Sequence, residues 1–282
     1  MTFRHNTEIG QNFLIDRSVA VWMTERARLS STDRVLEIGA GDGILTKSIL
    51  ASGCARVDAL EIDVRMKERL EPLAASDDRL RLHWSDAVKF DYSTLDETPT
   101  HVIANLPYHI TTPLLWKLLE FFSGSDMRYM LLMIQDEAAS RIAAGAGKRE
   151  SNPLSVTIAA AGDAAVLRKV SRTAFYPQPR VDSAIAEITL RSKDNPHTLL
   201  PRDATWRKLL SGSFATRRKT LANNWAGSFG IKKDECAAIL AAHSLDSRSR
   251  PEELTMPDWL SLRENSELTS YIERRRQDWK QP

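Results

Sequence analysis

The chain has 282 residues, of which 42% are hydrophobic and 27% are charged, and its formal net charge at pH 7 is +2. A chain of this length and composition can bury a core in one large α/β domain and a smaller second domain. No apolar run approaches the roughly 18 residues that a membrane-spanning helix needs, and the start, MTFRHNTEIGQNF, lacks both an apolar signal segment and an Arg-rich transit pattern. We therefore expect a cytoplasmic protein without membrane contact.

Short apolar runs alternate with helical patterns over the first 190 residues, which predicts βαβ units and a mostly parallel sheet. The first five of seven predicted strands are separated by segments long enough for crossover helices. The last two are joined by a short Pro-rich loop, which favours an antiparallel pair at one edge of the sheet. The seven predicted strands are Arg34–Ile38, Ala55–Glu61, Leu80–Trp84, His101–Ala104, Tyr129–Ile134, Ala164–Val170 and Ala184–Leu190.

From Asn195 onward the apolar spacing becomes three and four residues, which predicts a small C-terminal α-helical domain. Helices are expected at 203–225, 234–242 and 257–263, and the tail 271–282 predicts a basic arm or a final helix. The domain boundary therefore falls between residues 1–194 and residues 195–282.

Positive charge is concentrated in this last third of the chain. From Arg191 to the end there are 17 Lys and Arg against 12 Asp and Glu. Such an excess favours polyanion binding, and a solvated helical surface explains it about as well. The two cysteines, Cys54 and Cys236, lie far apart without partner His or Cys spacing, so we predict neither a disulfide nor a metal site.

Polar groups follow four successive predicted strands. A glycine-rich turn containing Gly39 and Gly41 follows the first strand, and its G-x-G-x-G spacing suits a nucleoside at least as well as a pyrophosphate. Glu61 ends the second strand, where an acidic residue can accept both ribose hydroxyls, and Asp86 follows the third, where it could accept from an adenine amine. Asn105 follows the fourth strand. Capping of the next helix explains each group singly, but four on one rim favour a nucleoside crevice.

The fourth strand runs into Asn105, Leu106, Pro107 and Tyr108. Proline biases the residue before it toward an extended backbone, so the Leu106 carbonyl is a candidate outward acceptor beside the Asn105 amide oxygen. Tyr108 supplies a ring face for stacking. The tetrad therefore suits a planar amine such as a nucleobase, although taken alone it is more typical of an ordinary strand-to-helix turn.

Taken with further motifs, the chain resembles the S-adenosylmethionine-dependent ribosomal RNA adenine N6,N6-dimethyltransferases of the KsgA type over nearly its whole length. The resemblance rests on GQNFL at 10–14, EIGAGDGILT at 37–46, LEID at 60–63, NLPY at 105–108, LSV at 154–156, FYPQPRVDS at 175–183 and RRKTL at 217–221. It implies a Rossmann-like class I methyltransferase fold with a seven-stranded sheet and an RNA-contacting helical domain.

The resemblance also implies roles for individual residues. S-adenosylmethionine would be bound by Asn12, Leu14, Gly39, Gly41, Glu61, Asp86 and Asn105. The substrate adenine would be held by Asn105, Leu106, Pro107, Tyr108 and Phe175, with the rings of Tyr108 and Phe175 against its two faces. The implied partner is small-subunit 16S rRNA in a pre-ribosomal 30S-type particle, and the implied product carries dimethylated N6 groups on two adjacent adenosines near its 3′ end. A monomer is expected.

Two other functions remain open on the sequence. One is the erythromycin-resistance type of large-subunit rRNA methyltransferase, which shares the cofactor motifs. The other is a non-catalytic RNA-binding or ribosome-assembly factor on the same fold. Two departures from the family pattern lie beside the tetrad: Ala104 where glycine is common, and His109 where asparagine is common.

Overall fold

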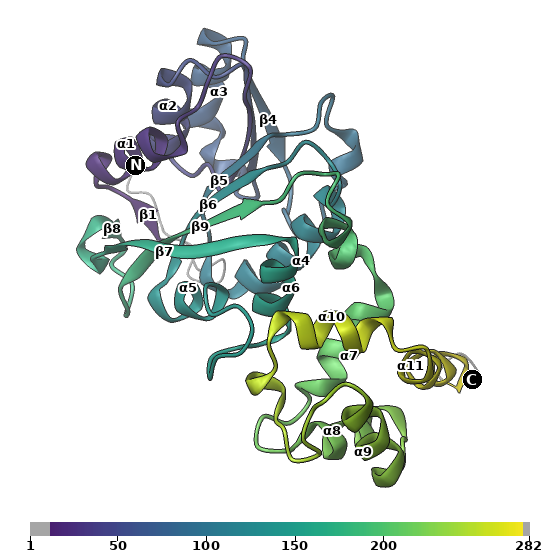
Figure 1. Cartoon of the computed structure of the whole chain (residues 1–282). Helices are drawn as coiled ribbons and strands as arrows, with labels where there is room; N and C mark the ends of the chain where they lie inside the picture. The colour runs from purple at the N-terminus through teal and green to yellow at the C-terminus, as the bar shows by residue number, and fades with distance from the viewer. Residues whose placement is uncertain (1–11, 279–282) are drawn as a thin grey trace.

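The computed structural model describes residues 12–278 and contains a seven-stranded sheet in the order β4-β3-β2-β5-β6-β9-β7 (Figure 1). β2 to β6 run parallel, whereas β9 is antiparallel to both β6 and β7. The strands are β2 (Arg34–Ile38), β3 (Arg56–Glu61), β4 (Leu80–Trp84), β5 (His101–Asn105), β6 (Tyr129–Gln135), β7 (Gly162–Val170) and β9 (Ser183–Leu190).

The predicted sheet is confirmed strand by strand. β2 and β4 have the predicted bounds, and the other five strands differ from prediction by one or two residues at an end. The expected antiparallel pair is β7 with β9, at the edge of the sheet. The strand order reverses between β2 and β5, which creates the crevice in which open α/β sheets bind ligands.

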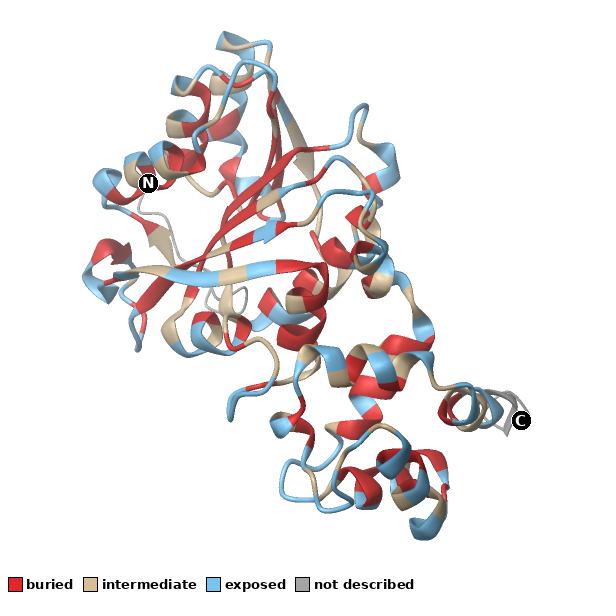
Figure 2. Ribbon diagram, viewed as in Figure 1, coloured by how far each residue is buried: buried red, intermediate tan, exposed pale blue. Residues whose placement is uncertain are grey.

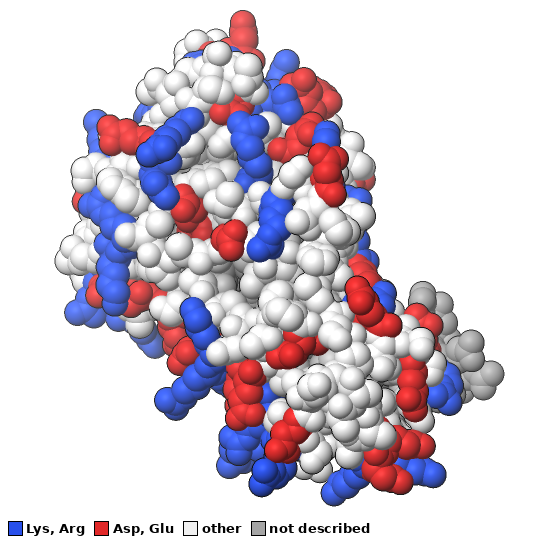
Figure 3. Space-filling model, in the orientation of Figure 1, with Lys and Arg blue, Asp and Glu red and all other residues white. Residues whose placement is uncertain are grey.

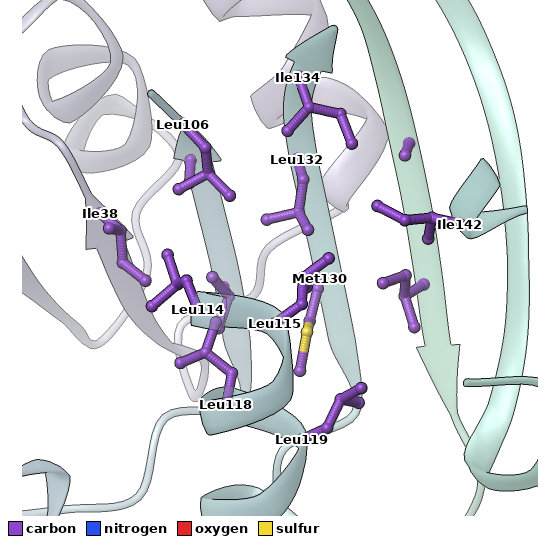
Figure 4. Close-up of a cluster of buried hydrophobic side chains, with 14 of the residues drawn as sticks. Ile38, Leu106, Leu114, Leu115, Leu118, Leu119, Met130, Leu132, Ile134 and Ile142 are labelled. Carbon is purple, nitrogen blue, oxygen red and sulfur yellow. The ribbon is translucent and has the colours of Figure 1, made fainter. Parts of the chain in front are cut away.

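Three helices pack on each face of the sheet, and their inward sides are buried (Figure 2). On one face lie α1 (Arg17–Ala27), α2 (Ile44–Ala51) and α3 (Lys67–Ser76). On the other lie α4 (Thr111–Phe122), α5 (Asp136–Ile142) and α6 (Pro153–Ala161). In Figure 4 the leucines of α4 point toward side chains of β2, β5 and β6, which fixes the strand that ends in the predicted tetrad.

The C-terminal region is helical, as predicted, and has a core of its own. Its largest fully buried side chains are Trp206, Trp225 and Trp259. The helices are α7 (Ala204–Ser213), α8 (Leu221–Phe229), α9 (Lys233–Ala242), α10 (Met256–Glu264) and α11 (Ser266–Asp278). The tail thus continues as a final helix, and residues 279–282 lie outside the described residues.

The single helix predicted over 203–225 is wrong, because the chain breaks between α7 and α8. The buried Asn224 side chain accepts a hydrogen bond from the Thr216 N–H at 3.1 Å and donates one to the Ser213 carbonyl at 2.6 Å. The Thr220 hydroxyl accepts from the Asn223 N–H and begins α8. The basic residues 217–219 therefore lie in an exposed turn and not on a helix.

α6 belongs to two cores at once. Leu154 and Ile158 face the core of the sheet, whereas Val156 and Ala160 are buried in the core of the helical region. The Trp206 indole N–H of α7 donates to the Thr157 hydroxyl at 3.0 Å, inside this contact. The helical region is therefore seated on α6 and is more than a linked appendage.

Within the described ranges no helix is long and apolar enough to cross a membrane. Over the same residues, no group of three or more His, Cys, Asp or Glu side chains is placed to hold a metal ion. Cys54 and Cys236 are both buried free thiols.

Glu37 is a fully buried acidic residue in the middle of the sheet. Neither of its carboxyl oxygens has a well-aligned hydrogen-bond partner in the described part of the chain, although the hydroxyl and the N–H of Thr46 are close enough to lower its pKa. Burial raises the pKa of Glu37 to about 8, and the nearby carboxylates of Glu61 and Asp42 act in the same direction. The folded state therefore keeps a proton that the unfolded chain releases above its ordinary pKa of 4.5.

Because the folded pKa is raised, the free energy of unfolding that Glu37 supports falls as pH rises from about 4.5 to about 8. Glu37→Gln is neutral at every pH, so we expect it to melt about 5 °C or more above the wild type at pH 8. The gap should shrink toward pH 5. Thermal unfolding followed by circular dichroism at pH 5, 6, 7 and 8 measures it, with the exposed Glu68→Gln as control. A gap that stays constant with pH would contradict the assignment.

Candidate active site

An open cleft lies beyond the carboxyl ends of β2, β3, β4 and β5, with about 1080 Å³ of space between its walls, mouth included. The structure brings together in its lining all eleven residues that the sequence predicted for the site. These are Asn12, Leu14, Gly39, Gly41, Glu61, Asp86, Asn105, Leu106, Pro107, Tyr108 and Phe175. Gly10 and Gln11 of the same predicted motif lie outside the described residues.

The glycine turn forms the floor of the cleft. Gly39 and Gly41 both have positive φ, 78° and 57°, which L side chains rarely adopt. A Cβ at Gly39 would lie 3.3 Å from the Asn105 carbonyl oxygen, and one at Gly41 would lie 3.1 Å from the Phe13 ring. Glycine at these positions leaves no side chain over the backbone, so that a ligand can approach it closely.

Glu61 joins this turn to the end of β3. One carboxylate oxygen accepts from the Gly41 N–H and the other from the Asp63 N–H, both at 2.8 Å. The side chain lines the cleft although the residue is only 6% exposed. Burial raises the pKa of Glu61, and the two backbone donors oppose that rise. Since each carboxylate oxygen can accept a second bond, the group can still receive ligand hydroxyls.

Asp86 makes a local turn contact and also lines the cleft. Its Oδ1 accepts from the Val88 N–H at 2.9 Å, which is the local turn contact expected of a strand-end aspartate. The residue also lines the cleft between Ser85 and Ala87. The capping alternative and a place at the ligand site are therefore compatible.

The tetrad is anchored at both ends. The Leu106 side chain is 2% exposed and points into the core beneath α4 (Figure 4), while the Leu106 N–H donates to the Met133 carbonyl at 3.0 Å. The Tyr108 hydroxyl lies 3.0 Å from that of Ser183, and burial raises the pKa of Tyr108. Within the described residues the Leu106 carbonyl accepts no hydrogen bond, which leaves it available as the predicted acceptor.

The Asn105 amide is oriented by the N-terminal segment. Its Nδ2 donates to the Asn12 carbonyl at 3.2 Å. This contact settles which end of the amide is nitrogen, and it leaves the Oδ1 atom for an incoming donor. Asn12, 93 positions away in the sequence, thus orients the Asn105 amide whose oxygen is the candidate acceptor.

A two-residue ribbon brings Phe175 to the same cleft. β1 (Phe13–Leu14) pairs antiparallel with β8 (Phe175–Tyr176), so Leu14 lies opposite Phe175 and Phe13 opposite Tyr176. Phe175 lines the cleft but is only 3% exposed, because most of its ring lies in the core with Leu14. Contact between its ring and a substrate base remains a prediction.

Among the apolar lining residues that were not predicted from the sequence, Phe13 and Ile62 lie beside predicted ones. Phe13 covers Gly41, and Ile62, 48% exposed, follows Glu61 at the end of β3. The sequence could have indicated Ile62 as a lining residue, because it is an apolar residue that directly follows the acidic residue at the end of β3. Phe13 stood between two residues that were predicted, but its ring direction depends on the distant β8.

Comparison with known proteins shows the family of this chain. The family model described as ribosomal RNA adenine dimethylase matches residues 2–262. The chain is 36% identical over 263 residues to the ribosomal RNA small subunit methyltransferase A of Moorella thermoacetica, covering 90% of this chain and 89% of that protein.

Two solved structures show the same fold at lower identity. A dimethyladenosine transferase from Plasmodium falciparum matches with a TM-score of 0.76 and 24% identity, over 89% of this chain and 95% of that one. The 23S rRNA methyltransferase ErmE matches with a TM-score of 0.65 and 23% identity, over 93% of this chain and all of that one. With its family model matched over nearly the whole length, the chain belongs to the ribosomal RNA adenine dimethylase family.

Proposed function

We propose that the protein transfers methyl groups from S-adenosylmethionine to the N6 amino groups of two adjacent adenosines near the 3′ end of small-subunit 16S rRNA. The observation that carries the proposal is the cleft in which the glycine turn, Glu61 and Asp86 meet the Asn105 tetrad. The family and the name of the 36% identical relative support the substrate class. The proposal includes a role in small-subunit biogenesis in the cytoplasm, with the protein acting as a monomer.

The residues at one end of the cleft fit S-adenosylmethionine. Gly39 and Gly41 present backbone where a Cβ would fill the space, which suits the close approach of a methionyl chain. Glu61 offers carboxylate oxygens to ribose hydroxyls, and Asp86 offers one to the adenine amine. The exposed Ile62 side chain gives the adenine an apolar surface.

The methyl group that S-adenosylmethionine supplies is electrophilic, because it is bound to a sulfonium sulfur. The nitrogen that must accept it is weakly nucleophilic, since its lone pair is delocalised into the adenine ring. The task of the protein is therefore to hold that nitrogen in line and to favour a pyramidal geometry, and no strong base is needed.

The tetrad supplies the groups for this task. The Asn105 Oδ1 and the Leu106 carbonyl can accept hydrogen bonds from the two N6–H groups, which favours a pyramidal nitrogen whose lone pair is less delocalised into the ring and is directed toward the methyl group. Tyr108, tethered to Ser183, provides a fixed ring face for the base. The released proton can leave to water through the open mouth.

The RNA would extend toward an arginine-lined groove between α5 and the α7–α8 turn. Its lining includes Arg141, Arg149, Arg217, Arg218 and Arg250, together with three glutamates. Arg217 is held there by donation to the Arg149 carbonyl at 2.6 Å. Basic side chains lie along this edge of the helical region with acidic side chains among them (Figure 3), and the arginines can contact phosphates. We propose that residues 1–194 form the catalytic domain and residues 195–282 an RNA-contacting domain, with Arg141 and Arg149 of the first contributing to the same groove.

Methyl-group incorporation into small- and large-subunit particles tests the function directly. Incorporation into small-subunit particles alone is expected. Incorporation into large-subunit rRNA would favour the erythromycin-resistance type, and no incorporation with tight RNA binding would favour an assembly factor.

Asn105→Ala removes one acceptor for the adenine amine. We expect kcat to fall about 100-fold or more, a size typical of losing one hydrogen bond that orients reacting groups, while the Kd for S-adenosylmethionine changes little. Single-turnover methylation and calorimetry separate the two quantities. The exposed Asn223→Ala is the matched control, and an unchanged kcat in Asn105→Ala would refute the role.

Glu61→Ala removes the acceptor assigned to the ribose. Because the loss also frees the Gly41 N–H, we expect the Kd for S-adenosylmethionine to rise by about 10-fold or more. Calorimetry measures it, and adenosine serves as a second ligand that carries the ribose and the adenine without the methionyl part. Equal affinities of variant and wild type would show that Glu61 has only a structural function.

Neutralising the basic turn tests the RNA surface. In the triple variant Arg217→Gln, Arg218→Gln and Lys219→Gln, the slope of log K against log salt for a small-subunit rRNA fragment should flatten by about 2, since about three phosphate contacts are lost. The pair Lys232→Gln and Lys233→Gln, exposed on the same region, is the control. An unaltered slope would restore the solvated surface as the explanation.

A further inference from the structure

Lys117 is a partly buried cation on α4, the helix that follows the Asn105 tetrad. Its ammonium group donates to the Val88 carbonyl at 2.7 Å and to the Phe90 carbonyl at 2.5 Å. It also lies 5.2 Å from the centroid of the Tyr92 ring, within the range of a cation–π contact. One side chain of α4 thus holds the loop that follows β4 at two backbone carbonyls.

The loop that Lys117 holds carries Asp86, the acceptor assigned to the adenine amine. The Asp86 Oδ1 accepts from the Val88 N–H at 2.9 Å, and the Asp86 carbonyl accepts from the Phe90 N–H at 2.8 Å. Val88 and Phe90 therefore bind Lys117 through their carbonyls and Asp86 through their N–H groups. Holding these two residues against α4 sets the direction of the Asp86 carboxylate.

The support behind the loop is rigid. Leu114 and Leu118 of α4 are fully buried in the core of the sheet (Figure 4). The Tyr92 side chain is 2% exposed, and its hydroxyl donates to the Ala87 carbonyl at 2.8 Å. Lys117 therefore joins an irregular loop to a helix that the core holds in place.

Lys117 orients the Asp86 carboxylate without occupying it. Among the described residues Lys117 forms no ion pair, and its partners are two carbonyls and a ring. Burial lowers the pKa of Lys117, and the charges of Asp86 and Asp91 oppose that fall. An ion pair with Asp86 would relieve more of the cost of burial, but it would take the oxygens that a ligand amine needs.

We propose that Lys117 is a positioning residue that gives the cofactor site its preference for adenine. By holding the carbonyls of residues 88 and 90, it keeps the Asp86 carboxylate aimed at the exocyclic amine of the S-adenosylmethionine adenine. The inference rests on the proposed function for the identity of the ligand. A 6-oxopurine presents a carbonyl oxygen in place of that amine, and a carboxylate that cannot turn away repels it.

Two thioether ligands test the preference without catalysis. S-inosylhomocysteine differs from S-adenosylhomocysteine only in carrying a carbonyl in place of the adenine amine. We expect the wild type to bind the adenosyl ligand at least about 10-fold more tightly, because one hydrogen bond to a charged group is at stake. Lys117→Met keeps the side-chain length but not the donors, and it should reduce this ratio to about 3-fold or less. Calorimetry measures both dissociation constants.

Lys89→Met is the matched control. It removes a positive charge 3.9 Å from the Asp86 Oδ2 and leaves the loop carbonyls with Lys117, so the ratio should stay as in the wild type. Lys117→Gln, which keeps one amide donor, is the second variant should Lys117→Met fail to fold, and its ratio should be intermediate. A ratio that is preserved in the Lys117 variants, even with both affinities lowered, would overturn the proposal. An equal fall in Lys89→Met would do the same.

Amide hydrogen exchange in the ligand-free protein tests the loop contact separately. The N–H groups of residues 88, 89 and 90 are bonded to Asp86 and should exchange at least about 10-fold faster in Lys117→Met. The Arg248 N–H, bonded to Asp246 in a distant turn, should exchange as in the wild type. Unchanged exchange at residues 88–90 would overturn the proposal. If the wild type bound neither thioether ligand, the proposed function would fail, and the exchange rates alone would decide whether Lys117 holds the loop.

Discussion

One buried carboxylate joins two loops at the floor of the ligand cleft. Glu61 accepts the Gly41 N–H with one oxygen and the Asp63 N–H with the other, so the glycine turn after β2 and the end of β3 are held as a unit. Its burial is costly for a charged group, and the backbone donors offset part of that cost. The floor of the cleft is thus set before any ligand arrives, and the Asn105 tetrad on the adjacent strand faces a fixed surface.

The position of the tetrad is fixed by core packing of Leu106 and by a hydrogen bond from Asn105 to the N-terminal segment. Leu106 is buried beneath α4, and this holds its backbone in place with the carbonyl left without an internal partner among the described residues. Asn105 is turned by the Asn12 carbonyl, which reaches it only because β1 pairs with β8. Because the adenine N6 is a weak nucleophile that must be aligned, it benefits from acceptors, the Asn105 oxygen and the Leu106 carbonyl, that have little freedom to move.

The sheet and the strand-end residues of the site could be predicted because both depend on local pattern, whereas Asn12, Leu14 and Phe175 were predicted only through the family resemblance. Apolar runs such as His101–Asn105 mark strands, and polar groups placed at their ends must meet at one edge of a parallel sheet. The features that could not be predicted depend on long-range contacts. The turn at 217–219 is broken out of a helix-like pattern by the buried Asn224, and the position of Phe13 is decided by a strand more than 160 residues away.

α6 has a consequence for how the chain can be divided. Its nine residues supply Leu154 and Ile158 to one core and Val156 and Ala160 to the other. A truncation after residue 194 would expose Val156 and Ala160 and leave Thr157 without its Trp206 donor. The remaining sheet domain would then have an exposed apolar surface on α6 that favours aggregation. Exchanging the helical region between relatives would therefore succeed only if the outward face of α6 were exchanged with it.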